Sequence, residues 1–232
     1  MADHGRSIFE GERSILGALS AEDRQRVLAN TSRRVVPRGN YVFHEGEVAS
    51  SFFLINSGLV AIERSTPKGE CATLTVYGPG EGFGELALVD EGAPRRSASA
   101  VALEACSLQV LNKRDFNELR QRHPSVELIL IGILRSQVIR LTSQLVDTLT
   151  EDARTKVLRT LCRLAEVFKV ADGNRIRITH ERLKTMAGVT RKVTDILNEI
   201  EIKGLIKRER GHAFYVPDLQ ALRAEAGLPP SQ

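Results

Sequence analysis

Apolar residues follow two different periods along this chain, and the change of period divides it into parts. Between residues 33 and 111, short runs of β-branched, aromatic and other apolar residues alternate with turn signals such as Asn56-Ser57-Gly58. Many short strands with regular turns predict an antiparallel sheet that is closed or sandwiched, and a jelly-roll barrel is the simplest such fold. The predicted strands cover residues 35–36, 41–43, 52–55, 59–62, 72–77 and 98–111.

Helical periodicity flanks this strand-rich part. Short helical pieces are predicted in residues 7–30, with Ser20 as a cap. A long helix is predicted from Pro124 to about Thr150, since proline suits a helix start. Its apolar residues recur as a heptad seam, which predicts pairing with a second copy in a two-fold dimer, and the alternative is that the stripe packs on its own barrel. The seam consists of Ile131, Leu134, Val138, Leu141 and Leu145.

A hinge is expected directly after the long helix. Asp152 can cap another helix over residues 153–170, which leaves Thr150 and Glu151 as the link between two domains. Residues 171–174 are then expected to form a surface turn.

Residues 178–207 have the punctuation of a helix-turn-helix. Thr179 can cap a first helix, Gly188 ends it, and Thr190 can cap a second helix. The two helices are expected to bury one shared apolar face. The residues expected to face inward in the second helix are Val193, Ile196, Leu197 and Ile200.

Two basic residues at the start of that second helix favour a nucleic-acid contact. Arg191 and Lys192 are placed in its first turn, where the helix dipole disfavours each cation by about 0.3–1 kcal/mol, so a docked polyanion explains them better than stability does. The alternative is an ordinary helical hairpin with two solvated basic residues. Residues 205–216 carry two β-prone runs around Gly211, which predicts a hairpin, and a hairpin after a helix-turn-helix is a wing.

The distribution of charge agrees with this placement. The chain carries a net charge of +4 over 232 residues. Residues 1–151 hold 17 Lys and Arg against 19 Asp and Glu, whereas residues 152–215 hold 15 against 8, a local balance of +7. Any nucleic-acid contact is therefore expected in the C-terminal part. The N-terminus shows no apolar signal region, and the longest apolar run, residues 128–134, is too short to cross a bilayer, so no membrane contact is expected.

The cysteines indicate no metal or disulfide framework. Cys71, Cys106 and Cys162 are far apart and form no Cys-x-x-Cys pair, which fits a reducing cytoplasm. Each is expected to be a small packed residue, and a redox-sensing thiol is the alternative.

Residues 78–99 have the composition of a phosphate-binding loop. Glycine at every second position lets the backbone approach a ligand, and the amides of a short helical turn over residues 85–89 can donate to a phosphate. Arg95, Arg96 and Ser97 follow and can clamp that phosphate, while Glu85 suits a sugar hydroxyl. The alternative is a glycine-rich barrel corner with solvated arginines.

The order of these parts resembles the cyclic-AMP receptor protein/FNR (Crp/Fnr) superfamily of bacterial transcription regulators, from about residue 7 to residue 216. Phe83-Gly84-Glu85-Leu86-Ala87-Leu88 together with Arg96-Ser97-Ala98 is similar to the phosphate-binding cassette of cyclic-nucleotide domains. Thr142-Ser143 is similar to the hydroxyl pair that meets the purine in cyclic-AMP binders, and residues 178–197 match the family's helix-turn-helix.

The resemblance implies an α+β fold in three parts. Residues 1–123 would form a jelly-roll cyclic-nucleotide-binding sensory domain, residues 124–150 a long dimerisation helix, and residues 151–232 a winged helix-turn-helix DNA-binding domain.

It also implies site residues. Glu85 would bind the ribose hydroxyl, with backbone contacts from Gly84 and Leu86. Ser97 and an arginine would hold the cyclic phosphate; the loop spacing leaves Arg95 or Arg96, and adjacency to Ser97-Ala98 favours Arg96. Thr142 and Ser143 would meet the base. The residues assigned to DNA are Thr179, Thr190, Arg191, Lys192, Thr194, Asp195, Arg208 and Arg210.

The sequence departs from the family pattern in informative places. Lys192 stands where many relatives carry glutamate, and Ile196 stands at a later arginine position, so the preferred operator should differ from the best-known consensus. The N-terminal cysteine cluster of the iron–sulfur branch is absent, and no Cys/His arrangement of the haem branch is evident, so neither cofactor and no metal is expected.

The sequence therefore predicts a cytoplasmic, homodimeric, DNA-binding transcription regulator controlled by cyclic AMP, with a double-stranded operator and RNA polymerase as partners. Cyclic GMP, a cyclic dinucleotide or activity without ligand are alternatives, as is a nucleotide-sensing scaffold that acts through a protein partner. An enzyme is not expected, because the candidate acids and bases show no paired or metal-ligand spacing. Those candidates are Glu85, Asp90, His123 and His180.

Overall fold

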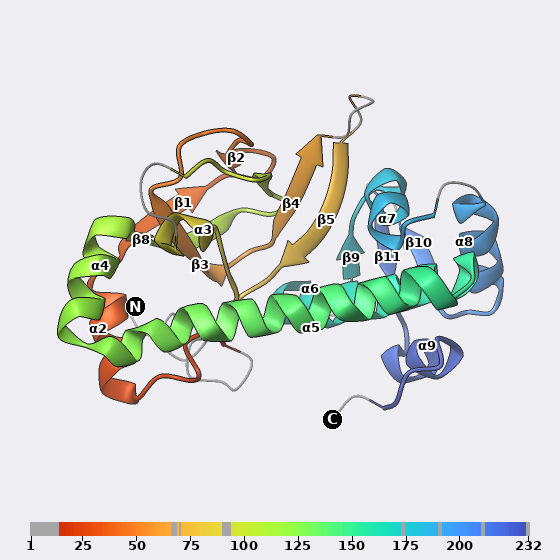
Figure 1. Cartoon of the computed structure of the whole chain (residues 1–232). Coiled ribbons are helices and arrows are strands. Elements are labelled where there is room, and N and C mark those ends of the chain that lie inside the picture. Colours follow the sequence, from red (N-terminus) through yellow and green to blue (C-terminus); the bar gives the residue numbers. More distant parts are fainter. Residues whose placement is uncertain are drawn as a thin grey trace. The chain divides into compact units, whose positions relative to one another are not determined.

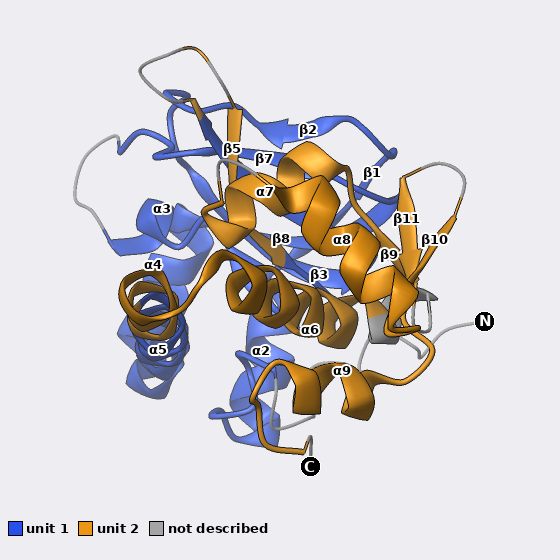
Figure 2. Ribbon diagram, turned by 90° about the vertical axis from the view of Figure 1, so that its right-hand side faces the viewer, with its two compact units in different colours: residues 1–64, 77–141 blue, residues 65–76, 142–232 orange. Residues whose placement is uncertain are grey.

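The computed structural model describes residues 14–65, 69, 71–89, 94–172, 175–189, 192–209 and 212–230 (Figure 1). The chain divides into two compact units, coloured separately in Figure 2. The first comprises residues 1–64 and 77–141, and the second comprises residues 65–76 and 142–232. No helix in the described part of the chain is long and apolar enough to pass through a membrane.

Two four-stranded sheets form the strand-rich part, which confirms the predicted sandwiched barrel. Their strand orders are β1-β8-β3-β6 and β2-β7-β4-β5. The strands are β1 (Ser32–Val36), β2 (Tyr41–Phe43), β3 (Ser51–Ser57), β4 (Val60–Ser65), β5 (Cys71–Tyr77), β6 (Gly82–Phe83), β7 (Ser99–Ala102) and β8 (Cys106–Asn112).

Strand β3 explains why the barrel sequence reads as continuous apolar runs rather than as a strict alternation. Phe53 and Ile55 face the core between the two sheets, while Phe52 and Leu54 face a second core made with helices. Because successive side chains of a strand point to opposite faces, both faces of β3 are buried.

The single strand predicted over residues 98–111 is wrong. Strand β7 ends at Ala102 and β8 begins at Cys106, and the two strands lie in different sheets. The intervening residues contain no glycine or proline, and therefore no turn signal. The turn is possible because Gly58 faces it: a Cβ on Gly58 would lie 2.5 Å from the carbonyl oxygen of Ala105.

Four helical segments and the start of a long helix build the second core of this unit. They are α2 (Ala21–Ala29), α3 (Leu86–Val89), α4 (Lys113–Arg122), the 3₁₀ helix η1 (Pro124–Glu127) and α5 (Leu128–Thr150). The Ser20 hydroxyl accepts a hydrogen bond from the Asp23 amide at 3.1 Å, which confirms the predicted cap. The long helix begins with a 3₁₀ turn at Pro124 rather than directly as an α-helix. Ile129 and Ile133 of α5 are buried in this core.

The second unit contains the helix-rich C-terminal part. Its elements are α6 (Ala153–Asp172), β9 (Arg175–Arg177), α7 (His180–Ala187), α8 (Val193–Ile202), β10 (Lys207–Glu209), β11 (Ala213–Tyr215) and α9 (Leu219–Glu225). The Asp152 carboxylate accepts a hydrogen bond from the Thr155 amide at 2.7 Å, which confirms the predicted cap of α6. Helix α6 runs two residues beyond the predicted end, to Asp172, where a surface turn was expected.

The predicted wing is present as the antiparallel pair of β10 and β11. A third strand, β9, pairs with β11 and was not predicted, and neither was α9. Because β9 has only three residues, its alternation was too short to detect.

The cysteines differ in exposure, so the expectation that all three are packed is wrong for Cys71, which is exposed. Burial raises the pKa of the Cys106 thiol to about 11 and that of the Cys162 thiol to about 12. Because the thiolate is the reactive form, we expect a thiol reagent at pH 8 to label only Cys71 in the folded chain and all three cysteines in denaturant. Counting labels by mass spectrometry, with Cys71→Ser as the control that removes the native signal, checks this; rapid labelling of Cys106 or Cys162 would contradict it.

Candidate functional site

The loop after β6 turns sharply at Gly84. This residue has φ +83°, in the left-handed region, and a Cβ there would lie 2.6 Å from Nη1 of Arg96 and 3.3 Å from the carbonyl oxygen of Ser51. Only glycine meets both demands without strain. The amide of Ala87 donates to the Gly84 carbonyl at 3.2 Å, so the turn leads directly through Glu85 into α3.

Arg96 closes over this turn from the opposite side. Its side chain is buried, with the residue only 7% exposed, and its guanidinium donates to the carbonyl oxygens of Gly84 at 3.2 Å and of Ser51 at 2.8 Å. The guanidinium carbon lies 4.0 Å from the ring centroid of Phe43, a cation–π contact. The Nε atom of Arg96 is also buried and has no hydrogen-bond partner among the described residues.

Within the described ranges, no carboxylate forms an ion pair with Arg96. Burial lowers the pKa of Arg96 to about 10, while the carboxylates of Glu47 and Glu85 act in the opposite direction. A pKa of about 10 leaves the guanidinium protonated at pH 7. Its described hydrogen bonds go to neutral carbonyl oxygens, so a buried cation with an unsatisfied Nε is available to an anion.

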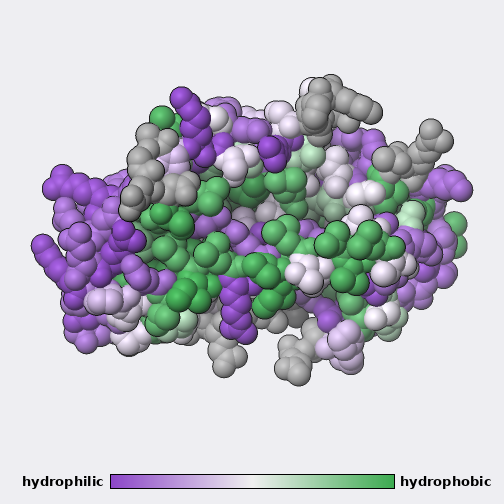
Figure 3. Space-filling model, in the orientation of Figure 1, coloured by the Kyte–Doolittle hydropathy of each residue, from purple (hydrophilic) through white to green (hydrophobic). Residues whose placement is uncertain are grey.

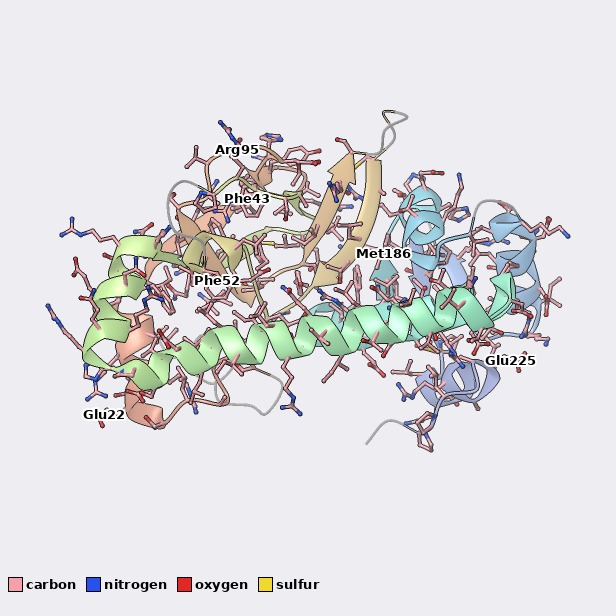
Figure 4. The ribbon with its side chains drawn as sticks, in the orientation of Figure 1. Glu22, Phe43, Phe52, Arg95, Met186 and Glu225 are labelled. Atoms are coloured by element: carbon pink, nitrogen blue, oxygen red, sulfur yellow. The ribbon has the colours of Figure 1, made fainter. Side chains whose placement is uncertain are left out.

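Arg95 points away from Arg96, and two other residues of the predicted site are exposed. Arg95 is exposed, points away from the barrel in Figure 4, and donates to the Gly46 carbonyl at 2.7 Å. Its backbone forms an isolated antiparallel bridge with Val48, and successive residues of such an extended segment point to opposite sides. Ser97 is exposed, and so is Leu86 on α3. The structure therefore brings Gly84 and Arg96 together and turns Arg95 outward.

Thr142 and Ser143 both lie on α5 and are exposed.

Helix α5 also contacts Tyr77, the last residue of β5, and the sequence did not predict this contact. Arg140 donates through Nη2 to the Tyr77 hydroxyl at 2.6 Å, and its guanidinium carbon lies 4.8 Å from the Tyr77 ring centroid. The half-buried Glu81 carboxylate accepts a hydrogen bond from the Gly78 amide at 2.7 Å, and desolvation raises the pKa of Glu81 while the Gly78 bond and Arg140 lower it. Arg140 lies outside the apolar seam, so the periodicity of the helix assigned it no role.

The first helix of the helix-turn-helix has the predicted ends. The Thr179 hydroxyl accepts a hydrogen bond from the Arg182 amide at 3.2 Å, and Gly188 follows α7 with φ +63°. The inward-facing residues predicted for the second helix are all buried: Val193, Ile196, Leu197 and Ile200.

The second helix begins later than predicted. Helix α8 starts at Val193, and Lys192 is its N-cap residue, with φ +66° and no side-chain capping bond. A left-handed residue cannot belong to a right-handed helix, so Lys192 precedes the first turn instead of lying in it. Thr190 is therefore not the cap, and both Thr190 and Arg191 lie outside the described residues. Thr194 and Asp195 are exposed in the first turn of α8.

The wing is braced against α8 by Arg208. Its Nε donates to the Glu201 carboxylate at 2.7 Å, and its guanidinium also donates to the Asn198 side chain. The backbone amide of Arg208 donates to Glu201 at 2.9 Å, a bond that lowers the pKa of Glu201. Arg210 lies outside the described residues.

A barrel with a buried arginine in a glycine turn, a long helix and a winged helix-turn-helix together define a class of DNA-binding regulators with a sensory domain. Residues 33–123 match the family model described as "Cyclic nucleotide-binding domain", and residues 155–225 match that described as "Crp-like helix-turn-helix domain".

Known proteins agree with this class. The chain is 33% identical over 190 residues to the "Cyclic AMP receptor protein" of Thermus thermophilus, covering 82% of this chain and 86% of that protein. It is 31% identical over 198 residues to the "CRP-like cAMP-activated global transcriptional regulator" of Mycobacterium tuberculosis, with 82% of this chain and 86% of that protein covered. The solved structure of the c-di-GMP responsive global regulator CLP of Xanthomonas campestris is similar with a TM-score of 0.68 and 25% identity, over 85% of this chain and 99% of that one.

The chain therefore belongs to the Crp/Fnr superfamily of transcription regulators, which confirms the resemblance found in the sequence. It carries a cyclic-nucleotide-binding domain and a DNA-binding domain, and its relatives are regulators of transcription rather than enzymes.

Proposed function

We propose that this chain is a homodimeric transcription regulator whose affinity for a specific DNA operator is controlled by cyclic AMP. The observation that carries the effector site is Arg96, a buried cation beside the Gly84 turn with an unsatisfied Nε. The names of the Thermus and Mycobacterium relatives include cyclic AMP, which supports this ligand over other cyclic nucleotides.

The proposed roles at the effector site follow from this arrangement. Arg96 and Ser97 hold the cyclic phosphate, while Glu85 accepts from the ribose hydroxyl, and the backbone of Gly84 and Leu86 adds contacts. The outward direction of Arg95 supports Arg96 as the clamp. Thr142 and Ser143 are proposed to meet the base.

The apolar seam of α5 supports the dimer. The five seam residues are between 43% and 63% exposed, whereas Ile129 and Ile133, on another face, are buried in the chain's own core. Figure 3 shows apolar side chains gathered along α5. An exposed apolar stripe of this length on one helix is best covered by the same stripe of a second copy. The seam residues are Ile131, Leu134, Val138, Leu141 and Leu145.

The DNA-binding part would read its operator mainly through α8. Ile196, at a position where relatives carry arginine, is buried and so contributes packing rather than a base contact. Lys192, Thr194 and Asp195 are exposed at the start of α8, beside the segment that carries Arg191. Recognition helices present such N-terminal residues to the major groove. As a regulator bound at a promoter, the dimer is proposed to act on RNA polymerase.

The regulation is proposed to be a shift between two states. Effector binding favours the geometry in which both recognition helices reach successive major grooves. A complete switch requires the effector to bind the competent state about 10⁴-fold more tightly than the other state.

A cyclic dinucleotide is the second candidate, because the similar regulator of Xanthomonas campestris is described as c-di-GMP responsive. Calorimetric titration of the purified full chain with cyclic AMP, cyclic GMP and cyclic di-GMP decides between them. Heat with cyclic AMP alone supports the proposal; heat with none of them, alongside intact DNA binding, overturns the effector assignment.

We expect Arg191→Ala to weaken operator binding at least about 10-fold and to change the preferred base at one operator position, since a good bidentate pair discriminates by about 1–3 kcal/mol. Binding assays across single-base operator variants at fixed salt measure this. Arg114→Ala, an exposed arginine of α4, is the control and should leave affinity unchanged. An equal loss on all sequences would make Arg191 a phosphate contact only.

A further inference from the structure

Four buried aromatic rings form a continuous stack inside the first unit. The ring centroids of Phe43 and Phe53 lie 5.6 Å apart, those of Phe53 and Phe83 5.2 Å apart, and those of Phe83 and Tyr77 6.4 Å apart. The last two pairs are nearly parallel, with interplanar angles of 13° and 12°. These separations are within the range of favourable aromatic contacts.

An arginine covers each end of this stack. The Arg96 guanidinium carbon lies 4.0 Å from the ring centroid of Phe43 and 5.5 Å from that of Phe53. At the other end, the Arg140 guanidinium carbon lies 4.8 Å from the Tyr77 ring centroid, and Nη2 of Arg140 donates to the Tyr77 hydroxyl at 2.6 Å. The aromatic stack therefore joins the arginine of the glycine turn to an arginine of α5.

The stack also runs through the loop itself. Phe83, its central ring, is directly followed by Gly84 and Glu85. The Glu85 carboxylate acts on the ionisation of both Arg96 and Tyr77, raising the pKa of each. Both ends of the stack are thus within electrostatic reach of one loop residue.

The packing leaves little room for one ring to move alone. All four rings are buried in the close-packed core of the barrel. Protein interiors are close-packed, so they transmit the displacement of one side chain to its neighbours instead of absorbing it. Arg140 precedes Leu141 of the apolar seam, so a change in its position acts on the helix that carries the seam.

We propose that Tyr77 and Arg140 are positioning residues that couple effector occupancy at Arg96 to helix α5 through the stacked rings of Phe43, Phe53 and Phe83. This inference rests on the proposed effector site. An anion bound by Arg96 competes with the carbonyl oxygens of Gly84 and Ser51 for its guanidinium, which moves the cation over Phe43. The stack then has one arrangement with the anion bound and another without it. These two arrangements favour different positions of Arg140, and the difference shifts the balance between the two states of the dimer.

The test uses Tyr77→Phe and Arg140→Gln in the full-length chain. Tyr77→Phe keeps the stacked ring and removes only the acceptor of the Arg140 bond. Arg135→Gln, which neutralises an exposed arginine of the same helix, is the matched control. Calorimetry gives the affinity for cyclic AMP, and operator binding with and without cyclic AMP gives the coupling ratio.

We expect both variants to keep cyclic-AMP affinity within about threefold and to lower the coupling ratio at least about 10-fold, which is about 1.4 kcal/mol of coupling. The double variant should lose no more than Arg140→Gln alone, because that substitution already removes the hydrogen bond that Tyr77→Phe removes. The control should retain the wild-type ratio. A role in stability alone would lower the melting temperature and leave the ratio unchanged.

The outcomes separate the two proposals. A wild-type chain that binds neither cyclic AMP, cyclic GMP nor cyclic di-GMP overturns the effector site and this inference with it. A wild-type chain that binds cyclic AMP and responds to it, with Tyr77→Phe retaining the full coupling ratio, overturns this inference alone.

Discussion

Replacing Arg96 by glutamine is expected to reduce cyclic-nucleotide affinity at least about 100-fold. A hydrogen bond to a charged group contributes about 1.5–3 kcal/mol, and a guanidinium can make two such bonds to one phosphate. Losing both corresponds to about 3–6 kcal/mol, and about 2.7 kcal/mol already gives a 100-fold change. The operator affinity of this variant should no longer respond to cyclic AMP.

The control for this prediction is one residue away. Arg95→Gln removes an equal charge from a side chain that is exposed and bonded to Gly46, so its effector affinity should stay within about twofold of wild type. Arg96→Lys should restore only part of the affinity, because lysine keeps the charge and loses the planar fork. Equal losses in the Arg95 and Arg96 variants would contradict the assignment of Arg96 as the clamp. The Arg96→Gln variant also loses the cation–π contact with Phe43, and its melting temperature measures the effect of that loss on stability.

The sequence could identify the parts of this site that depend on local chemistry. Glycine at every second position predicted a close backbone approach in this loop, and at Gly84 the structure shows a positive φ and Nη1 of Arg96 at 2.6 Å from the place of a Cβ. The sequence favoured Arg96 over Arg95 from adjacency alone. The opposite directions of the two side chains depend on the bridge to Val48, a pairing between residues far apart in the chain.

Other features depend on contacts that no local pattern records. The Tyr77–Arg140 bond joins residues 63 positions apart. The turn between β7 and β8 has no glycine of its own, because the glycine that makes room for it is Gly58, in the turn between β3 and β4. The start of α8 was misplaced because Thr190 is the better capping residue by type, whereas the backbone at Lys192 is left-handed and helix geometry begins only after it.

The second large effect is expected at the seam of α5. Val138→Glu and Leu141→Glu together should convert the dimer to monomers at micromolar concentration and abolish operator binding. Each of these side chains contributes about 1.5–3 kcal/mol when buried, and a dimer buries four of them, so at least about 6 kcal/mol, or about four orders of magnitude in the dissociation constant, is lost. The carboxylates add repulsion across the seam. Sedimentation equilibrium measures the dissociation of the dimer. Binding assays with the full operator and with a matched half-site measure the loss of operator binding.

Ser136→Glu is the matched control for this change, because it adds the same charge at an exposed position of α5 outside the seam. It should remain dimeric with wild-type operator affinity. A seam variant that stays dimeric would mean that another surface pairs the copies, and a wild-type chain that sediments as a monomer would remove the dimer altogether. Because half-sites of an operator lie one helical turn apart, two recognition helices must be held at a fixed separation, and only a rigid connection between copies provides it. Loss of the seam should therefore remove operator binding even though each winged helix-turn-helix remains folded.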